Sequence, residues 1–335
     1  MRAPVAVLGA GSWGTALADL VGRKQARHEV RLWAYEAEVV EGINRDHVNP
    51  LFLPGVPLSP NLVAVADPRE AIDGCPIIVS AAPSHALRSV LARVRDAVPE
   101  GVLIVSATKG LETDTLALMS DVVRETLPQA AVAALSGPSF AQEVCEGQPT
   151  AVVVAARDPA DVLRAQRLLS TPRFRIYSSG DVVGVELGGA LKNVIAIAAG
   201  VLEGLGLGAN PRAALITRGL AEITRLGVAM GAEPLTFAGL AGMGDLILTA
   251  TGALSRNRAL GVALAGGTSF EDYRAQHRSV AEGANASVAG ARLGAREGVE
   301  LPITEKVRQV LFEGRPARDG VEELMTRDLK AEQWR

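Results

Sequence analysis

The fold of this chain is set by residues 4–20, which run PVAVLGAGSWGTALADL. Residues 4–8 suit a buried strand, and residues 15–20 have the pattern of a helix. Between them Gly9, Gly11 and Gly14 form G-x-G-x-x-G, in which the first glycine permits a sharp turn, the second lets backbone approach a pyrophosphate, and the third lets helix and strand pack closely. The segment therefore predicts a dinucleotide site at a helix N-terminus. The alternative is an ordinary glycine-rich turn between strand and helix.

Composition indicates a globular protein of about two domains. Of the 335 residues, 48% are hydrophobic and 21% are charged, and the formal net charge is -3. This small excess charge provides no overall basic field, so a nucleic-acid partner is not expected. The apolar run near the first residue is too short for a membrane span or an export signal, so we expect a cytoplasmic protein without membrane insertion. Cys75 and Cys145 lack metal-ligand spacing, and we expect buried thiols and no metal.

Apolar runs alternate with helical patterns in the first half of the chain, which is the rhythm of a parallel sheet covered by helices. The expected strands are residues 5–8, 29–33, 62–65, 77–81, 102–106, 131–135, 150–154 and 174–177. Long helices are expected afterwards at residues 187–202, 211–230, 255–264, 288–297 and 302–311, the second of them opened by Asn210-Pro211 and stopped by Gly231. We predict an α/β fold, with a Rossmann-type doubly wound sheet in residues 1–185 and an all-helical substrate domain in residues 186–335.

Residues that follow strands are the first site candidates, because ligands of doubly wound sheets bind beyond the carboxyl ends of the strands. Lys109 follows the fifth expected strand, and residues 136–142 follow the sixth. Both loops are expected to face the same crevice as Gly11. Taken alone, Lys109 also suits a solvated loop. Ser139 with Gln142 has the spacing of a capping box, which would make the serine a plain N-cap.

Lys192 lies within a predicted helix of small and apolar residues. Helical side chains lean toward positions i−3 and i−4, here Gly189 and Gly188, which predicts open space around the ammonium group. Burial and a second cation, which Lys109 would supply, both lower the pKa of a lysine and suit it to proton exchange at neutral pH. Hydride transfer between a nicotinamide and a carbinol or carbonyl carbon fits such a lysine. The alternative is a lysine that reaches solvent while the glycines serve close helix packing.

A second polar cluster, Ser255-Arg256-Asn257-Arg258, opens another predicted helix. Ser255 is the expected N-cap, and the other three residues fill the first turn. Cations oppose the helix dipole at this end, so two arginines there favour a bound anion such as phosphate. The alternative is a pair of solvated arginines. Asp245, which follows a glycine-rich stretch, is either a site residue or a cap.

These patterns leave three candidate functions. The first is reduction of a small phosphorylated ketone. The second is dehydrogenation of a 3-hydroxy acid or of 6-phosphogluconate by a relative with the same two domains, in which asparagine typically follows the lysine by three or four positions; here Asn193 is adjacent. The third is a non-catalytic protein that senses dinucleotides, against which the presence of Lys192 argues.

Together, several segments resemble the bacterial NAD(P)-dependent glycerol-3-phosphate dehydrogenases over nearly the whole chain. They are residues 9–14, 107–110, 135–141, 184–197, 210–226, 240–249, 255–258 and 301–305. The resemblance implies reduction of dihydroxyacetone phosphate to sn-glycerol 3-phosphate with NAD(H) or NADP(H), for phospholipid synthesis. It also implies that Lys192 is the proton acceptor in the reverse direction.

The same resemblance implies the remaining site residues. Those expected around the substrate are Lys109, Gly137, Ser139, Lys192, Asp245, Ser255, Arg256 and Asn257. Those that it implies for the dinucleotide are Ser12, Trp13, Lys109, Ala141, Arg256, Val280 and Glu282, in addition to the three glycines of the first loop.

The end of the second expected strand bears on the choice of dinucleotide. Tyr35 and Glu36 stand where family members often carry histidine and a basic residue near the adenosine ribose. A carboxylate there suits a free 2′-hydroxyl and repels a 2′-phosphate, so we expect NADH to be preferred to NADPH. The alternative is that Glu36 caps the next helix. The Ala-rich helices suit either a core or an interface, and a homodimer is the expected assembly.

Overall fold

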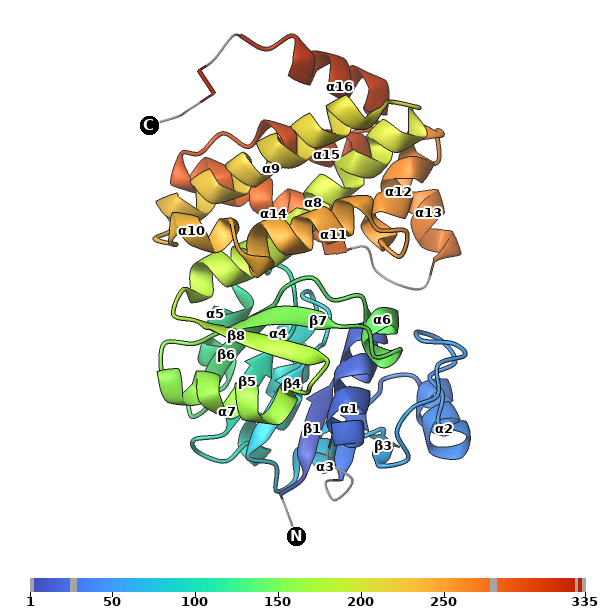
Figure 1. The fold of residues 1–335 in the computed structure, drawn as a ribbon, viewed down its shortest axis with the longest axis vertical. Helices are drawn as coiled ribbons and strands as arrows, with labels where there is room; N and C mark the ends of the chain where they lie inside the picture. The colour runs from blue at the N-terminus through green and yellow to red at the C-terminus, as the bar shows by residue number, and fades with distance from the viewer. Residues whose placement is uncertain (1–2, 25–28, 278–281, 329–330, 333–335) are drawn as a thin grey trace.

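The computed structural model describes residues 3–24, 29–277, 282–328 and 331–332. Figure 1 shows a sheet flanked by helices in the lower half and a bundle of helices above it. All eight expected strands are present, with ends that differ by no more than two residues from the prediction. They are β1 (Val5–Leu8), β2 (Val30–Trp33), β3 (Leu62–Val65), β4 (Ile77–Ser80), β5 (Leu103–Ser106), β6 (Ala131–Ser136), β7 (Thr150–Ala155) and β8 (Phe174–Ser179).

The strands form one sheet in the order β3-β2-β1-β4-β5-β6-β7-β8. Strands β1 to β6 are parallel, and the order changes direction beside β1, which is where doubly wound sheets open a ligand crevice. The parallel rhythm expected for the whole sheet is wrong for its last two strands, because β7 runs antiparallel to β6 and β8 follows β7. An antiparallel neighbour needs no long crossover, and only one short helix connects β6 to β7.

Helices cover both faces of the sheet, so its strands are apolar on both sides. In β1, Val7 joins the hydrophobic cluster that contains Leu17 of α1, whereas Leu8 joins the cluster that contains Leu91 of α4. The helices of this half are α1 (Ser12–Lys24), α2 (Ala37–Asp46), α3 (Pro68–Ile72), α4 (Leu87–Val94) with the 3-10 turn η1 (Arg95–Ala97), α5 (Met119–Thr126), α6 (Ala141–Cys145) and α7 (Pro159–Leu169). Cys75 and Cys145 are free, buried thiols, as predicted.

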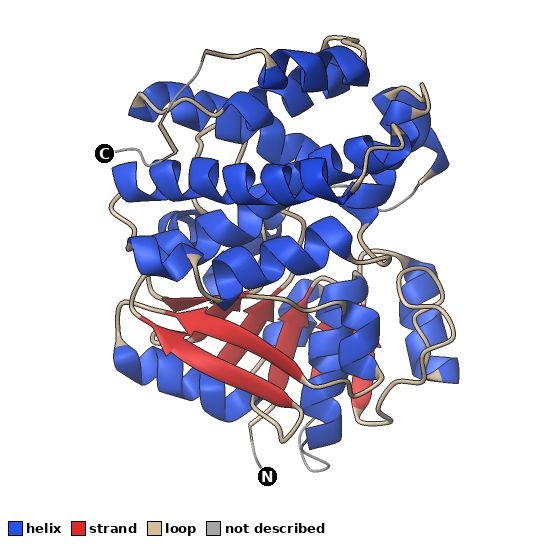
Figure 2. Cartoon of the chain, turned by 45° about the horizontal axis from the view of Figure 1, so that its top comes forward, coloured by secondary structure: helices blue, strands red, loops and turns tan. Residues whose placement is uncertain are grey.

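The second half is helical and is built around α8 (Val182–Gly204), which Figure 2 shows among the other helices. By length and composition α8 could cross a membrane, yet 89% of its apolar window is buried inside the protein. It contacts the π-helical turn η2 (Leu240–Gly244) and several helices. The remaining helices are α9 (Ala209–Ala229), α10 (Pro234–Phe237), α11 (Asp245–Thr251), α12 (Arg256–Ala265), α13 (Phe270–Gln276), α14 (Glu282–Glu297), α15 (Pro302–Phe312) and α16 (Ala317–Met325).

Two predicted helix caps are wrong, and α8 and α14 begin at Val182 and Glu282 rather than at the expected residues 187 and 288. Helix α9 has Gly208 as its N-cap, and Pro211 lies within its first turn, where N–H groups have no acceptor in the helix. Helix α6 begins after Phe140, so Ser139 is not its cap. The hydroxyl of Ser139 instead donates to the carbonyl of Gly137 at 2.9 Å, because Gly137 (φ +132°) turns the chain back on itself. Gly231 (φ +87°) follows the end of α9, as expected.

Close contact between α8 and α12 positions the second polar cluster. A Cβ atom at Gly261 would lie 2.0 Å from the carbonyl oxygen of Ile197, and one at Gly200 would lie 2.0 Å from that of Arg258. Only glycine permits backbones to approach this closely. The N-terminus of α12 is therefore held beside the middle of α8, where Lys192 and Asn193 lie.

Candidate active site

The three glycines after β1 have different surroundings. Gly9 has φ +113°, and a Cβ atom there would lie 2.8 Å from the backbone of Ala81. A Cβ atom at Gly14 would lie 1.9 Å from the carbonyl oxygen of Gly9. Gly11, by contrast, would meet no atom within 4 Å. Packing thus requires the first and third glycines, and the second faces open space of the kind that an approaching pyrophosphate needs.

The start of α1 fits an anion. The N–H of Thr15 bonds to the carbonyl of Gly11 at 2.9 Å, so the three N–H groups before it lie ahead of the first bond of the helix. The hydroxyl of Ser12 donates to the carbonyl of Phe52 at 2.6 Å. The buried indole N–H of Trp13 has no hydrogen-bond partner among the described residues. This loop and helix start therefore fit the phosphates of a dinucleotide.

Lys192 lies in the middle of α8 with 6% of its surface exposed. Its ammonium group donates to a carboxylate oxygen of Asp245 and, at 2.8 Å, to the hydroxyl of Thr249. Both partners belong to α11, one turn apart; Asp245 is the first residue of this helix, after the N-cap Gly244, so the interpretation of Asp245 as the cap is wrong. The π-helical turn η2 leads directly into α11, and such turns recur at functional sites. The interpretation of Lys192 as a solvent-reaching side chain is wrong.

Burial lowers the pKa of Lys192 to about 7; the negative charge of Asp245 opposes this shift, and the positive charge of Lys109 adds to it. An amine with this pKa both holds and releases a proton near neutrality. Lys192 is therefore suited to general acid and general base chemistry.

Lys109 follows β5 and reaches the same carboxylate. Its ammonium group donates to the second oxygen of Asp245 at 2.7 Å and to the carbonyl of Gly137 at 2.9 Å. The expected proximity of Lys109 to Lys192 is confirmed by their shared partner. Two ammonium groups thus share one carboxylate, and this excess positive charge favours an anionic ligand.

The predicted open space around Lys192 is wrong. A Cβ atom at Gly188 would lie 2.5 Å from the carbonyl oxygen of Ala241, and one at Gly189 would lie 2.4 Å from the hydroxyl oxygen of Ser136. The glycine pair lets α8 approach η2 and the end of β6. The direction of the lysine is set by its bonds to α11 rather than by the glycines behind it.

The two arginines in the first turn of α12, Arg256 and Arg258, have different surroundings. Ser255 caps the helix, as predicted, by accepting from the N–H of Arg258 at 3.2 Å. Arg258 pairs with Glu203 and donates to the carbonyl of Gly252 at 3.1 Å. Arg256 is exposed and makes no hydrogen bond or ion pair with any described residue. Of these two arginines, Arg256 is therefore the one whose guanidinium group is available to bind an anion.

Two buried amides connect three helices at this point. Asn257 donates to the side-chain oxygen of Asn193 at 3.0 Å and accepts from the N–H of Gly283 at 3.1 Å. A Cβ atom at Gly283 would lie 2.7 Å from the same oxygen of Asn257. This chain of bonds fixes the start of α14 relative to α8 and α12.

The other predicted dinucleotide residues are more dispersed. Tyr35 is 81% exposed at the end of β2, and Glu36 occupies the N-cap position of α2 without a side-chain capping bond. The carboxylate of Glu36 therefore does not cap α2. Ala141 is the first residue of α6. Glu282 opens α14, and Val280 lies outside the described residues.

The structure adds two polar residues that the sequence interpretation missed. Thr249 contacts Lys192, and the one available signal was its position four residues after Asp245 in an apolar helix. Ser84 follows β4, and its backbone N–H and hydroxyl donate to the carboxylate of Glu282 at 3.2 and 2.6 Å. Contacts between residues so distant in sequence leave no local pattern. Among the described residues no group of three or more metal-ligating side chains occurs.

Comparison with known proteins gives one family. The model of the NAD-dependent glycerol-3-phosphate dehydrogenase N-terminus matches residues 4–162, and that of the C-terminus matches residues 181–322. A glycerol-3-phosphate dehydrogenase (NAD(P)+) of Geobacter sulfurreducens is 56% identical over 337 residues, which is 100% of both chains.

Solved structures agree with this result. The crystal structure of a glycerol-3-phosphate dehydrogenase from Coxiella burnetii matches with a TM-score of 0.93 and 39% identity over 97% of this chain and 99% of that one. A glycerol-3-phosphate dehydrogenase from Saccharomyces cerevisiae matches with a TM-score of 0.80 and 29% identity over 96% of this chain and 100% of the other.

Titration of Lys192 tests the electrostatics of the site. We expect nitrogen-15 NMR of the lysine side chains to give Lys192 a pKa of about 7. Lys109→Met should raise this pKa because a repelling cation is lost, and Asp245→Asn should lower it because an attracting anion is lost. Lys24→Met, on the far side of the sheet domain, is the control and should leave it unchanged. A value near the ordinary ~10.4 for Lys192 would contradict the arrangement.

Proposed function

Because this chain belongs to the NAD-dependent glycerol-3-phosphate dehydrogenase family, we propose that it reduces dihydroxyacetone phosphate to sn-glycerol 3-phosphate, reversibly, with NADH or NADPH. This is the first of the three functions that the sequence left open. The observation that carries the mechanism is the buried carboxylate of Asp245, which holds the ammonium groups of Lys192 and Lys109 together beyond the sheet.

In the proposed mechanism Lys192 moves the proton. The reduced nicotinamide, when bound, supplies a hydride to C2 of the ketone. Lys192 gives its proton to the carbonyl oxygen, so that C2 and its oxygen each gain one hydrogen and a secondary alcohol results. In the reverse direction neutral Lys192 takes the hydroxyl proton. A pKa of about 7 supports both roles.

The phosphate of the substrate is proposed to bind at the start of α12. Arg256 makes no hydrogen bond or ion pair with a described residue, although the charge of Glu282 attracts it, and the first N–H groups of this helix add their dipole. Ser255 and Asn257 flank it with a hydroxyl and an amide. We propose Lys109, Gly137, Ser139 and Asp245 as the remaining substrate contacts, since Asp245 binds both lysines and the carbonyl of Gly137 accepts hydrogen bonds from Lys109 and Ser139.

For the dinucleotide we propose the loop from Gly9 to Gly14 together with Tyr35, Glu36, Lys109, Ala141, Arg256, Val280 and Glu282. The open space at Gly11 and the unpartnered indole N–H of Trp13 support this set.

We propose a domain boundary at residues 185–186, within α8. Val182 and Val185 belong to a hydrophobic cluster with Ala134 of β6 and Ala155 of β7, whereas Leu187 belongs to the cluster of the helical half. We also propose a cytoplasmic location and a role in phospholipid synthesis. The proposed assembly is a homodimer, supported by exposed apolar side chains such as Leu235 and Ile247 and testable by sedimentation equilibrium.

Removal of Lys192 tests the mechanism. We expect Lys192→Ala to lower kcat by a factor of about 10² to 10⁴, because the proton donor is lost, while the dissociation constant for the dinucleotide stays close to that of the parent. Absorbance at the nicotinamide band measures turnover, with dihydroxyacetone phosphate compared against 3-hydroxy acids and 6-phosphogluconate. Lys24→Ala serves as the control. Retained turnover in Lys192→Ala would refute the role, and turnover only with a hydroxy acid would refute the substrate.

Arg256 tests the phosphate site. Loss of a charge-assisted bond of about 1.5–3 kcal/mol predicts that Arg256→Ala raises the KM for dihydroxyacetone phosphate by about 10- to 100-fold, with a smaller change in kcat. Arg258→Gln is the matched control: Arg258 lies two residues after Arg256 in the same helix, and its guanidinium group already pairs with Glu203. The phosphate assignment fails if the KM of Arg256→Ala equals that of the parent or if both variants change it equally.

Steady-state kinetics test the choice of dinucleotide. We expect a higher kcat/KM with NADH than with NADPH, because the carboxylate of Glu36 repels a 2′-phosphate. Glu36→Ser should reduce this preference, and Glu38→Ser, two residues later in the first turn of α2, should not. A higher kcat/KM with NADPH for the parent protein would overturn the prediction.

A further inference from the structure

The chain crosses from the sheet domain to the helical domain immediately after Lys109. Thr108 is still tied to the sheet, since its hydroxyl donates to the carbonyl of Ala82 at 2.8 Å. Three residues later, Leu111 belongs to the hydrophobic cluster of the helical half. We propose that residues 111–118, here called the tongue, hold Lys109 in its catalytic position, and that Leu116 and Arg292 are positioning residues for it. The proposal rests on the proposed function, in which Lys109 acts beside Lys192.

Three leucines anchor the tongue. Leu111, Leu116 and Leu118 are 1%, 8% and 4% exposed, and they share a cluster with Leu191 of α8 and Leu293 of α14. A segment that begins at the end of a sheet strand thus buries its apolar side chains among helices. Withdrawal of three buried leucines into water is unfavourable, so their burial keeps the tongue against the helical domain.

The backbone of the tongue is a closed turn. Leu111 and Leu118 form an antiparallel bridge, and the N–H of Glu112 donates to the carbonyl of Ala117 at 3.0 Å. Leu116 has φ +62°, in the left-handed region, which is unfavourable for a residue with a side chain. Burial of its side chain offsets this cost. The conformation therefore depends on the contact with the helical domain.

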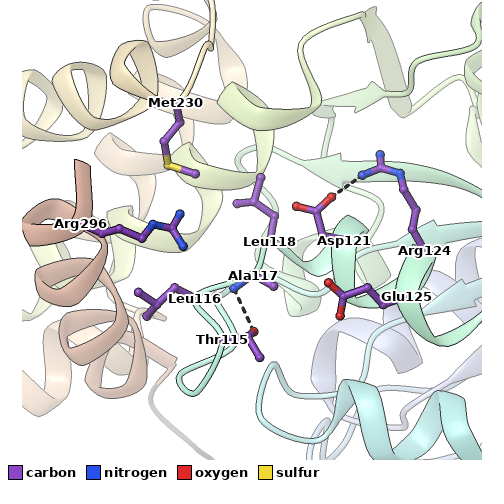
Figure 3. A pocket seen from close by; sticks show the side chains of 9 residues that line it. All are labelled: Thr115, Leu116, Ala117, Leu118, Asp121, Arg124, Glu125, Met230 and Arg296. Atoms are coloured by element: carbon purple, nitrogen blue, oxygen red, sulfur yellow. Dashed lines mark hydrogen bonds and ion pairs between the residues drawn. The ribbon is translucent and has the colours of Figure 1, made fainter.

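Arg292 of α14 clamps the tip of the tongue. Its guanidinium group donates to the carbonyl of Thr113 and, at 3.5 Å, to that of Asp114. On the flank, Leu116 and Leu118 border a pocket of about 310 Å³ together with Met230 and Arg296. Figure 3 shows Met230 and Arg296 approaching the tongue from the helical side across this space. Packing is incomplete on that flank, so the position of the tongue depends on the leucines and on Arg292.

The tongue is also tied back to the sheet domain. Glu112 accepts two hydrogen bonds from Arg88 of α4, at 2.8 and 2.7 Å, and Arg88 also pairs with Glu125 of α5. This second tether offers a matched comparison. Loss of Arg292 removes the bonds between the tip of the tongue and α14, whereas loss of Arg88 removes the tether to α4 and leaves the leucines and the Arg292 bonds intact.

The position of the tongue affects the reaction through the distance between the ammonium group of Lys109 and the side chains of Asp245 and Lys192. Asp245 and Lys192 both belong to the helical domain, and Lys109 contacts Asp245 only while its loop stays against that domain. A tongue that loosens lets Lys109 retreat. Lys192 then loses the neighbouring cation that lowers its pKa, so its proton is held more tightly.

The test compares Arg292→Met, Leu116→Ala and Arg88→Gln in the full-length protein. Arg292 is exposed, so its variant should fold, and thermal unfolding verifies this. We expect Arg292→Met and Leu116→Ala to lower kcat by about tenfold or more, because a small displacement of Lys109 from its position in the site slows the reaction. In glycerol 3-phosphate oxidation the rise of kcat with pH should move to higher pH. The KM for the dinucleotide should stay unchanged in both variants. Arg88→Gln should keep kcat within about twofold of the parent value and leave the pH profile unshifted.

The outcomes separate the two proposals. The proposed role of the tongue is overturned if the pH profile of kcat in Arg292→Met coincides with that of the parent. It is also overturned if Arg88→Gln shifts this profile by the same amount as Arg292→Met. If Lys192→Ala loses turnover in the same series, the proposed function still stands. If Lys192→Ala retains turnover, the proposed proton-transfer role of Lys192 fails, and turnover only with a hydroxy acid would refute the proposed substrate.

Discussion

The carboxylate of Asp245 is the interaction on which the site depends. It is fully buried, and each of its oxygens takes one ammonium group, from Lys109 at the end of β5 and from Lys192 in α8. Removal of one partner from a buried ion pair typically costs about 3–5 kcal/mol, because a charge is left uncompensated. Here the charge joins a sheet strand to two helices. The two halves of the chain are therefore coupled at the atoms that the proposed mechanism uses.

Backbone contacts make this coupling geometrically feasible. Gly188 lets α8 meet the turn before Asp245, and Gly261 lets α12 meet α8. Side chains at these positions would collide with the facing backbone, so the helices could not approach as closely. The amides of Asn193 and Asn257 then continue the connection to Gly283, where α14 begins. Close packing without side chains thus brings polar groups from four helices to one place.

The sequence predicted those features that local patterns encode. The eight strands were apolar runs, the loop from Gly9 to Gly14 has a motif, and Lys192 was conspicuous because its helix is otherwise apolar. Ser255 was correctly predicted as a cap from its position alone. The direction of β7 was not predictable, since strand polarity depends on the length and path of a connection. The partners of Lys192 were not either, because Thr249 lies 57 positions away in the sequence.

A perturbed pKa alone would not have located the site. Burial also raises the pKa of Glu186 and of Glu222 to about 7. Glu186, however, accepts from the N–H and the hydroxyl of Ser120 at the start of α5, and Glu222 accepts from the N–H of Ile303 at the start of α15. Each carboxylate caps a helix from outside it, which accounts for its burial. Lys192 differs because its carboxylate partner is shared with a second cation, Lys109, beyond the strand ends, and the two ammonium groups leave an excess of positive charge there.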